Sequence, residues 1–149
     1  MINNRSNLYD FYTLSTVLTG FNQFELLSTG IGEMYYKTIH DNTDEGVFRN
    51  LLQEWISIES EYTHNKTNQN SIIKNQIMHH PDFGPVARSI IMLWYTGCWS
   101  YNDKKTFVVD QESYKQGLMW KAIGAHSIGA NPQGYGAWSL SPEGNAGRE

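Results

Sequence analysis

The chain has 149 residues, a formal net charge of -4 and 40% hydrophobic residues, which suffices for one domain with a core that needs no covalent cross-link. The acidic balance, with a pI near 5.7, argues against a nucleic-acid-binding protein, since such proteins present a basic face. A single cysteine excludes an internal disulfide and a cysteine-only metal site. No run of 18 apolar residues occurs, so the sequence predicts no direct membrane span.

Two helical patterns open the chain. Apolar residues recur at helical spacing over residues 8–21, where Gly20 is a plausible end of the helix. A second stripe over residues 24–39 predicts a single further helix. Gly30 and Gly32 each weaken that helix by up to about 1 kcal/mol, so close packing at these positions would be a reason to keep them.

A third helix is predicted after Asn42, which has the character of a cap residue, with Glu45 in the favourable acidic first turn. Its apolar residues stay in helical register over residues 48–58. Residues 61–70 are polar and without a period, which predicts a loop. Residues 71–78 have the pattern of a short helix.

The most apolar stretch of the chain follows Gly84 and Pro85, a favourable helix start, and extends to Trp99. Its apolar residues cover every side of the expected helix, which therefore needs a second layer over it. That layer is either another helix of this chain or another protein, and the residues leave both possibilities open.

The last third of the chain changes character. Residues 100–112 predict a loop in which 106–109 is extended, without a second strand signal to pair with it. The residues 113–116 form a capping-box pattern that leads into a last helix ending near Ile123.

These patterns predict an all-α fold, a compact bundle of about five or six helices formed by residues 1–125. Residues 126–149 are rich in glycine and proline and have no regular period, which predicts an extended C-terminal tail. The tail carries Tyr135 and Trp138, large aromatic side chains that suit a segment docking on a partner subunit. The alternative is a tail that folds back on its own bundle.

No catalytic pattern emerges. None of the five histidines forms a His-x-x-x-His pair, so a metal site would require long-range assembly. The pair Gly30 and Gly32 lacks the third glycine of a dinucleotide loop, because position 35 is tyrosine. No Gly-x-Ser-x-Gly motif is present. Cys98 has two interpretations, a small buried apolar group or a residue at a subunit contact that cross-links in an oxidising compartment.

Three separated motifs carry a resemblance to a known family. They are Leu14-Ser-Thr-Val-Leu-Thr-Gly-Phe21, Ile90-Ile-Met-Leu-Trp-Tyr-Thr-Gly97, and Tyr114-x-x-Gly-Leu-Met-Trp-Lys-Ala-Ile-Gly-Ala-His126 followed by Pro132-x-Gly-Tyr-Gly-Ala-Trp138. In this order they resemble the small subunit of membrane-associated, FAD-dependent sugar and polyol dehydrogenases, the sorbitol, fructose and glucose dehydrogenase group.

The resemblance implies a non-catalytic accessory subunit. It implies a large partner subunit that carries FAD and oxidises the sugar or polyol, and a cytochrome c subunit with haem c that passes on the electrons. The small subunit would hold no cofactor itself, and would stabilise the large subunit and assist its maturation and export. It would act in the periplasm, associated with the inner membrane through the complex. Members of this group usually carry a twin-arginine signal, whereas here Arg5 stands alone.

We expect the partner interface to use aromatic residues and their neighbours on the central helix and the tail. The predicted interface residues are Trp94, Tyr95, Cys98, Trp99, His126, Pro132, Tyr135 and Trp138. No catalytic, cofactor-binding or metal-binding residue is predicted. The alternative function is a stand-alone small helical ligand-binding protein with an aromatic-lined pocket.

Overall fold

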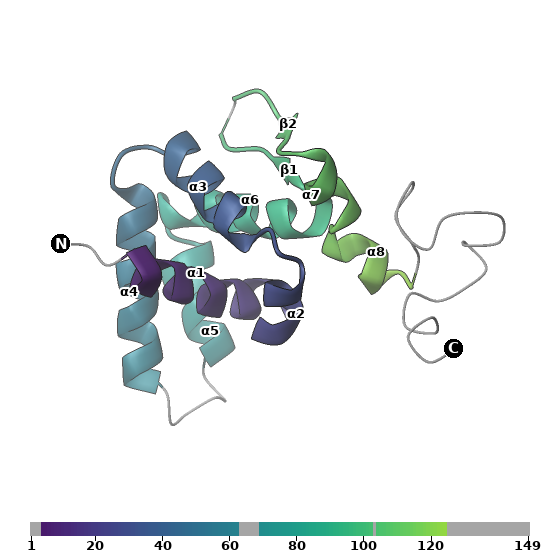
Figure 1. Ribbon diagram of the computed structural model, residues 1–149. Helices are drawn as coiled ribbons and strands as arrows, with labels where there is room; N and C mark the ends of the chain where they lie inside the picture. The colour runs from purple at the N-terminus through teal and green to yellow at the C-terminus, as the bar shows by residue number, and fades with distance from the viewer. Residues whose placement is uncertain (1–3, 63–68, 103, 125–149) are drawn as a thin grey trace, which may run out of the picture.

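The computed structural model describes residues 4–62, 69–102 and 104–124, which form a bundle of helices with one short hairpin (Figure 1). The longer helices are α1 (Asn4–Thr19), α3 (Gly32–Asn42), α4 (Val47–Tyr62) and α6 (Phe83–Thr96). Shorter helices connect and flank them: α2 (Gln23–Ser28), α5 (Gln69–Ile73), the π-helical η1 (Lys74–Met78), α7 (Gln111–Lys115) and α8 (Leu118–Ala122). The predicted all-α class is confirmed, and the predicted tail of residues 126–149 lies outside the described residues.

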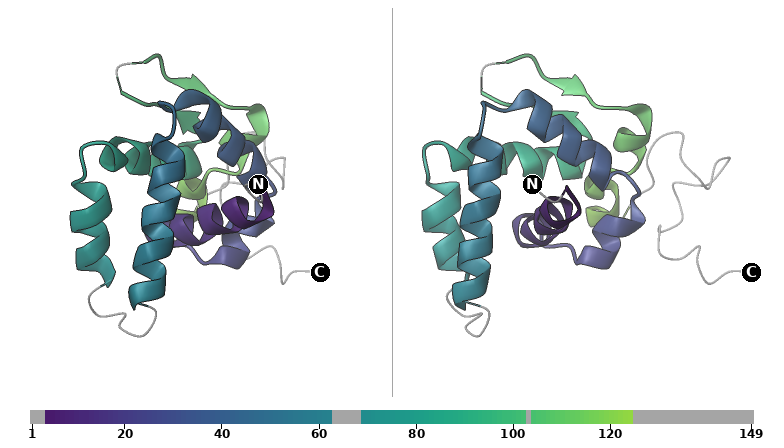
Figure 2. Two further views of the ribbon diagram at one scale, coloured as in Figure 1. Left: turned by 90° about the vertical axis from the view of Figure 1, so that its left-hand side faces the viewer. Right: turned by 60° about the vertical axis from the view of Figure 1, so that its left-hand side comes forward.

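The helices α1 and α6 form the centre of the bundle. Helix α1 starts against the side of α4 and runs across the molecule to α2 (Figures 1 and 2). Helix α6 packs on α1, α4, η1 and α8, so that most of its apolar surface faces this chain's own helices. The sequence left open whether the central helix is covered by this chain's own helices or by another protein. In the structure this chain's own helices cover it. Of the large apolar side chains of α6, that of Met92 stays exposed, with 43% of its surface accessible to solvent.

Hydrogen bonds to hydroxyl groups and a carbonyl of α1 fix the positions of α4 and α6. The Trp94 indole N–H donates to Ser15 Oγ at 3.0 Å in the buried core. The Trp55 indole N–H donates to Thr13 Oγ1 at 2.8 Å, and the Tyr95 hydroxyl donates to the Thr19 carbonyl at 2.9 Å. A buried indole N–H without an acceptor would cost about 1–3 kcal/mol, so these contacts specify the packing as well as stabilise it.

Aromatic rings fill the space between α1, α3 and α6. Trp94 stacks on Phe11 with ring centroids 6.0 Å apart, and Tyr35 meets the Trp94 ring edge-on at 4.9 Å. All three side chains are fully buried. Such offset and edge contacts suit the quadrupoles of the rings and add to the burial of their apolar area.

The predicted single helix over residues 24–39 is wrong, because the chain forms α2 and α3 with a break between them. Gly30 adopts a φ of +71°, a left-handed conformation that interrupts a helix and that glycine adopts without steric cost. At Gly32 a Cβ atom would collide with the Tyr12 side chain. Close packing is therefore the reason for glycine at position 32.

The predicted cap at Asn42 is also wrong. Asn42 is the last residue of α3, and its side-chain amide donates to the Thr38 carbonyl at 2.7 Å. Helix α4 starts five residues later, at Val47. The asparagine thus contributes to the end of one helix instead of the start of the next.

The central helix is shorter than predicted: it ends at Thr96 and is followed by the C-cap Gly97, whose φ is +73°. A Cβ atom on Gly97 would lie 2.6 Å from the Ser113 backbone, so α7 requires glycine here. Cys98 and Trp99 form β1, which pairs antiparallel with β2 (Phe107–Val108). The extended segment predicted around 106–109 therefore pairs with Cys98 and Trp99, which the sequence pattern had placed in the central helix.

The predicted capping box at residues 113–116 is wrong as well. Asp110 is the N-cap of α7, accepting a hydrogen bond from the Gln111 N–H, and Ser113 is buried inside the helix. The expected last helix is divided into α7 and α8 by a turn at Gln116 and Gly117.

The first prediction concerns the buried bond of Ser15. Ser15→Ala leaves the Trp94 N–H without an acceptor, and we expect the free energy of unfolding to fall by about 1–3 kcal/mol. Thr16→Ala is the matched control, since the Thr16 hydroxyl bonds only to the Thr13 carbonyl of its own helix. Urea unfolding followed by tryptophan fluorescence measures both, and equal stability of the two variants would contradict this role of Ser15.

Two carboxyl groups lie close together where α1 meets α4. Asp10 is only 9% exposed, and burial raises the pKa of its carboxyl above the ordinary value. Burial also raises the pKa of the half-buried Glu59, and the charge of Asp10 adds to that rise. A raised pKa means that the folded chain holds these protons more tightly than the unfolded chain does.

The second prediction is the resulting pH dependence. Because ionised Asp10 is disfavoured in the fold, Asp10→Asn should raise the free energy of unfolding at pH 7 by up to about 1 kcal/mol. The gain should shrink as the pH falls through the raised pKa, and vanish below the ordinary aspartate pKa of about 3.9. The exposed Asp82→Asn serves as the control in urea unfolding from pH 3.5 to 8. A gain from Asp10→Asn that is independent of pH would contradict the prediction.

Candidate interaction surface

Two of the predicted interface residues lie in the core. Trp94 is 0% and Trp99 2% exposed, so the folded chain presents neither ring on its surface. Trp94 is held by Ser15, and Trp99 stacks on Tyr101 with ring centroids 5.9 Å apart. Both tryptophans are buried because other segments of the chain cover them: α1 packs on Trp94, and Tyr101 packs on Trp99. The sequence alone could not show which segments meet these two side chains.

The other two described interface residues reach the surface. Tyr95 is half-buried, and its ring meets the Phe21 ring edge-on at 5.9 Å, which braces the segment before α2. Cys98 is a free, half-buried cysteine on β1, whose N–H donates to Thr96 Oγ1 at 3.1 Å. A contact of these two residues with a partner stays a prediction.

The remaining four predicted residues belong to the C-terminal segment. They are His126, Pro132, Tyr135 and Trp138, and all lie outside the described residues.

A long-range ion pair joins α2 and α8. Lys121 Nζ lies 2.9 Å from Glu25 Oε1, although the two residues are 96 positions apart. Glu25 also closes a capping box, because its other carboxylate oxygen accepts the Asn22 N–H at 3.0 Å while Asn22 Oδ1 accepts the Glu25 N–H. The hydrogen bond from Lys121, and next the bond from the Asn22 backbone, lower the pKa of Glu25 below its ordinary value. The ion pair thus brings the two helices together near the last described residue, and because both side chains are partly exposed it stabilises this contact only weakly.

Three large apolar side chains are exposed on these two helices. Phe24 and Leu27 on α2 are 79% and 48% exposed, and Ile123 at the end of α8 is 70% exposed. We call Phe24, Leu27 and Ile123 the α2–α8 face. Phe24 and Leu27 belong to the apolar stripe over residues 24–39 that predicts one helix. They are exposed because α2 is a separate short helix that buries only Leu26.

The hairpin adds two further exposed apolar residues. Phe107 is 40% and Val108 53% exposed on β2. Phe107 lies opposite the buried Trp99, and Val108 lies opposite Cys98. The surface around Cys98 is thus partly apolar.

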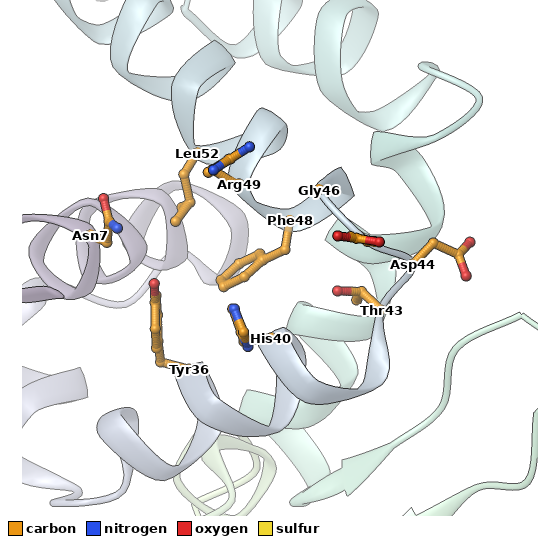
Figure 3. A pocket seen from close by; sticks show the side chains of 10 residues that line it. Asn7, Tyr36, His40, Thr43, Asp44, Gly46, Phe48, Arg49 and Leu52 are labelled. Atoms are coloured by element: carbon orange, nitrogen blue, oxygen red, sulfur yellow. The ribbon is translucent and has the colours of Figure 1, made fainter. Parts of the chain in front are cut away.

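A hollow of about 480 Å³ opens between the start of α1, helix α3 and the start of α4 (Figure 3). Phe48 and Leu52 of α4 form its apolar floor, since both side chains are almost fully buried. Polar side chains surround this floor, among them Asn7, His40 and Arg49. A second hollow of about 590 Å³ adjoins it and shares Tyr36 and His40 as lining residues. The sequence stripes gave no indication of either hollow, because the lining comes from three separate segments.

The described residues include no group of three or more His, Cys, Asp or Glu side chains that could hold a metal ion. His80 has a structural role, since its Nδ1 accepts the backbone N–H groups of Asp82 and Phe83 at 3.1 and 3.2 Å.

The Tyr35 hydroxyl is fully buried without a hydrogen bond to a described residue. Burial raises the pKa of Tyr35 above its ordinary value, an effect that the nearby Ser113 hydroxyl only partly offsets.

None of the helices in the described part of the chain combines the length and the hydropathy needed to cross a bilayer.

The fold and its surface define a small all-α protein with an exposed apolar face. The family model described as membrane bound FAD containing D-sorbitol dehydrogenase matches residues 2–139, which is most of the chain. The chain belongs to this family, as the resemblance of its three motifs predicted. Neither the comparison with curated proteins nor the comparison with solved structures gives a match.

Proposed function

We propose that this chain is a non-catalytic accessory subunit that binds the FAD-containing large subunit of a membrane-bound polyol dehydrogenase. The family match, which associates the chain with an FAD-containing D-sorbitol dehydrogenase, supports an assembly of this kind. In the proposal, flavin and the oxidation of the polyol belong to the large subunit. This chain stabilises that subunit and assists its maturation and export to the periplasm. A cytochrome c subunit completes the complex.

The α2–α8 face is the observation that carries the proposal. A Phe side chain at 79% and an Ile side chain at 70% exposure leave much apolar area in water. Apolar clusters on fixed helices are the usual centre of a permanent interface, where burial of each large side chain contributes about 1.5–3 kcal/mol. The Asn22 capping box stabilises the start of α2, and the Glu25–Lys121 ion pair brings α2 and α8 together before a partner arrives. A preformed face lowers the entropy cost of association.

The proposed tail, residues 126–149, extends the same interface. The last described residues, at the end of α8, lie on the α2–α8 face, so the following segment starts at this surface. Its Pro132, Tyr135 and Trp138 are suited to a groove on the partner. Tyr95 and Cys98 are proposed as contacts at the margin of the interface, each half-buried in the free chain.

A second candidate function is a stand-alone ligand-binding protein. The hollow of about 480 Å³ beside Tyr36 and Phe48 favours it, because its size and aromatic lining are within the range of small-ligand sites. Native mass spectrometry of the isolated chain distinguishes the two functions, since a ligand-binding protein retains a small molecule without any partner.

The third prediction tests the α2–α8 face directly. The double variant Phe24→Ser and Ile123→Ser removes two large exposed side chains, and we expect at least a tenfold loss of association with the large subunit, about 1.4 kcal/mol or more. The measurement is the yield of flavin-containing complex after co-production and affinity purification through this chain. Ile56→Ser, a similar change at a 40% exposed position on α4, is the control. An undiminished yield from the double variant, with unchanged circular dichroism, would rule out this face.

The fourth prediction concerns the tail. Truncation after Ala130 should lower the yield of intact complex, because the aromatic anchors Tyr135 and Trp138 are lost. The helical circular dichroism signal should stay nearly unchanged, since the described helices end at Ala122. Equal recovery of complex with and without the tail would contradict the proposed docking.

A further inference from the structure

The two adjoining hollows form a second surface of the molecule, which we call the α3 groove. Its lining includes Asn7 and Leu8 at the start of α1, whereas the α2–α8 face lies beyond the other end of that helix. Sixteen residues of α helix span about 24 Å. Figure 1 shows α4 on one side of the molecule and α2 and α8 toward the other, with α3 running between them. The hollow beside Phe48 therefore lies away from the α2–α8 face, whereas the adjoining hollow extends to Glu33 in the first turn of α3, which follows α2 in the chain.

A ridge formed by the side chains of Tyr36 and His40 lies between the two hollows of the groove. Tyr36 and His40 lie one turn apart on α3 and line both hollows. The Tyr36 ring packs against Phe11 at 5.9 Å and Phe48 at 5.3 Å, so its position is fixed from within the core. Two hollows on either side of a fixed aromatic ridge suit a segment that places one side chain in each of them.

The charges are distributed in the same way in both hollows. Among its described lining residues, the hollow in Figure 3 has the carboxylates of Asp44 and Glu45 and one permanent cation, Arg49. Among the described lining residues of the adjoining hollow are the carboxylates of Glu33 and Asp41 and one permanent cation, Lys37. The described residues therefore give each hollow one carboxylate more than they give it permanent cations.

Existing interactions do not remove that excess. In the adjoining hollow, Lys37 Nζ lies 3.8 Å from Asp41, which leaves Glu33 without a cationic partner among the described residues. In the other hollow, Asp44 accepts a hydrogen bond from the neutral Tyr101 hydroxyl at 3.2 Å. Each hollow thus attracts one further positive charge, and a neutral or acidic occupant would leave the carboxylates unpaired.

We propose that the α3 groove binds a basic segment of a partner protein, with one arginine or lysine side chain in each hollow. The aliphatic stem of each side chain would pack on the apolar and aromatic floor, including Tyr36 and Phe48, while its charged end reaches the carboxylates at the rim. A guanidinium over the Tyr36 ring would gain a cation–π contribution as well. The ridge matches such a segment better than a single small ligand, because it separates the two binding hollows. The chain then has an acidic interface in addition to the apolar one.

The fifth prediction is tested by site-specific photocrosslinking in the purified complex. His40, whose side chain is 68% exposed on the ridge, is replaced in the full chain by p-benzoylphenylalanine. After irradiation at low salt, mass spectrometry identifies the linked peptide. We expect a segment of another subunit with at least two Lys or Arg residues near the link, and a yield that falls as salt is added.

Matched charge variants complete the test. Glu33→Gln with Glu45→Gln should reduce the crosslinking yield at least fivefold at low salt and much less at high salt. Glu61→Gln with Glu112→Gln removes the same charge at exposed positions outside the groove and should leave the yield unchanged. The proposal is overturned by equal yields from the two double variants, or by a link to a segment without basic residues. A link to this chain's own residues 1–6, to a second copy, or to a retained small molecule also overturns it. None of these outcomes bears on the α2–α8 face, which the flavin-containing yield reports separately.

Discussion

The hydrogen bond between Trp94 and Ser15 is the constraint on which the rest of the bundle depends. It is buried and joins α6 to α1 across 79 positions of sequence. Ser15 also donates to the Phe11 carbonyl at 2.7 Å, which leaves its oxygen oriented to accept the indole N–H. Thr13 and Thr19 provide the corresponding acceptors for Trp55 and Tyr95. Helix α1 thus fixes the rotation of α4 and α6 through three of its residues, Thr13, Ser15 and Thr19.

Because α6 is covered by this chain's own helices, the proposed partner surface lies elsewhere. Phe24 and Ile123, on or next to the short helices α2 and α8, are the most exposed large apolar side chains of the described residues, although others, such as Tyr9, lie on the longer helices. Short helices bury little surface of their own, and here the Glu25–Lys121 pair and a capping box hold α2 and α8 together. This arrangement produces a firm apolar face at one end of an otherwise complete bundle. The chain belongs to the family of a membrane-bound FAD-containing dehydrogenase, and this membership supports the partner proposed for the face.

Several features could be predicted from the sequence because they depend on local pattern. The helices around Phe11, Trp55 and Trp94 follow from apolar spacing, and the π-helical turn before His79 falls in the predicted short helix of residues 71–78. The motifs also identified the family. The candidate site was predicted less well. Trp94 and Trp99 were predicted at an interface and lie in the core, whereas Phe24 and Ile123, which no interface prediction included, lie at the surface.

The sequence by itself determined the all-α class, the main helical stripes and the family, since periodicity and motif order are properties of neighbouring residues. Only the tertiary structure decided which apolar residues are covered, because cover depends on contacts between distant segments. The split of residues 24–39 at Gly30, the pairing of Cys98–Trp99 with β2, and the Glu25–Lys121 contact all arise in this way. The α3 groove has the same origin, since three segments must meet before its carboxylates form one surface.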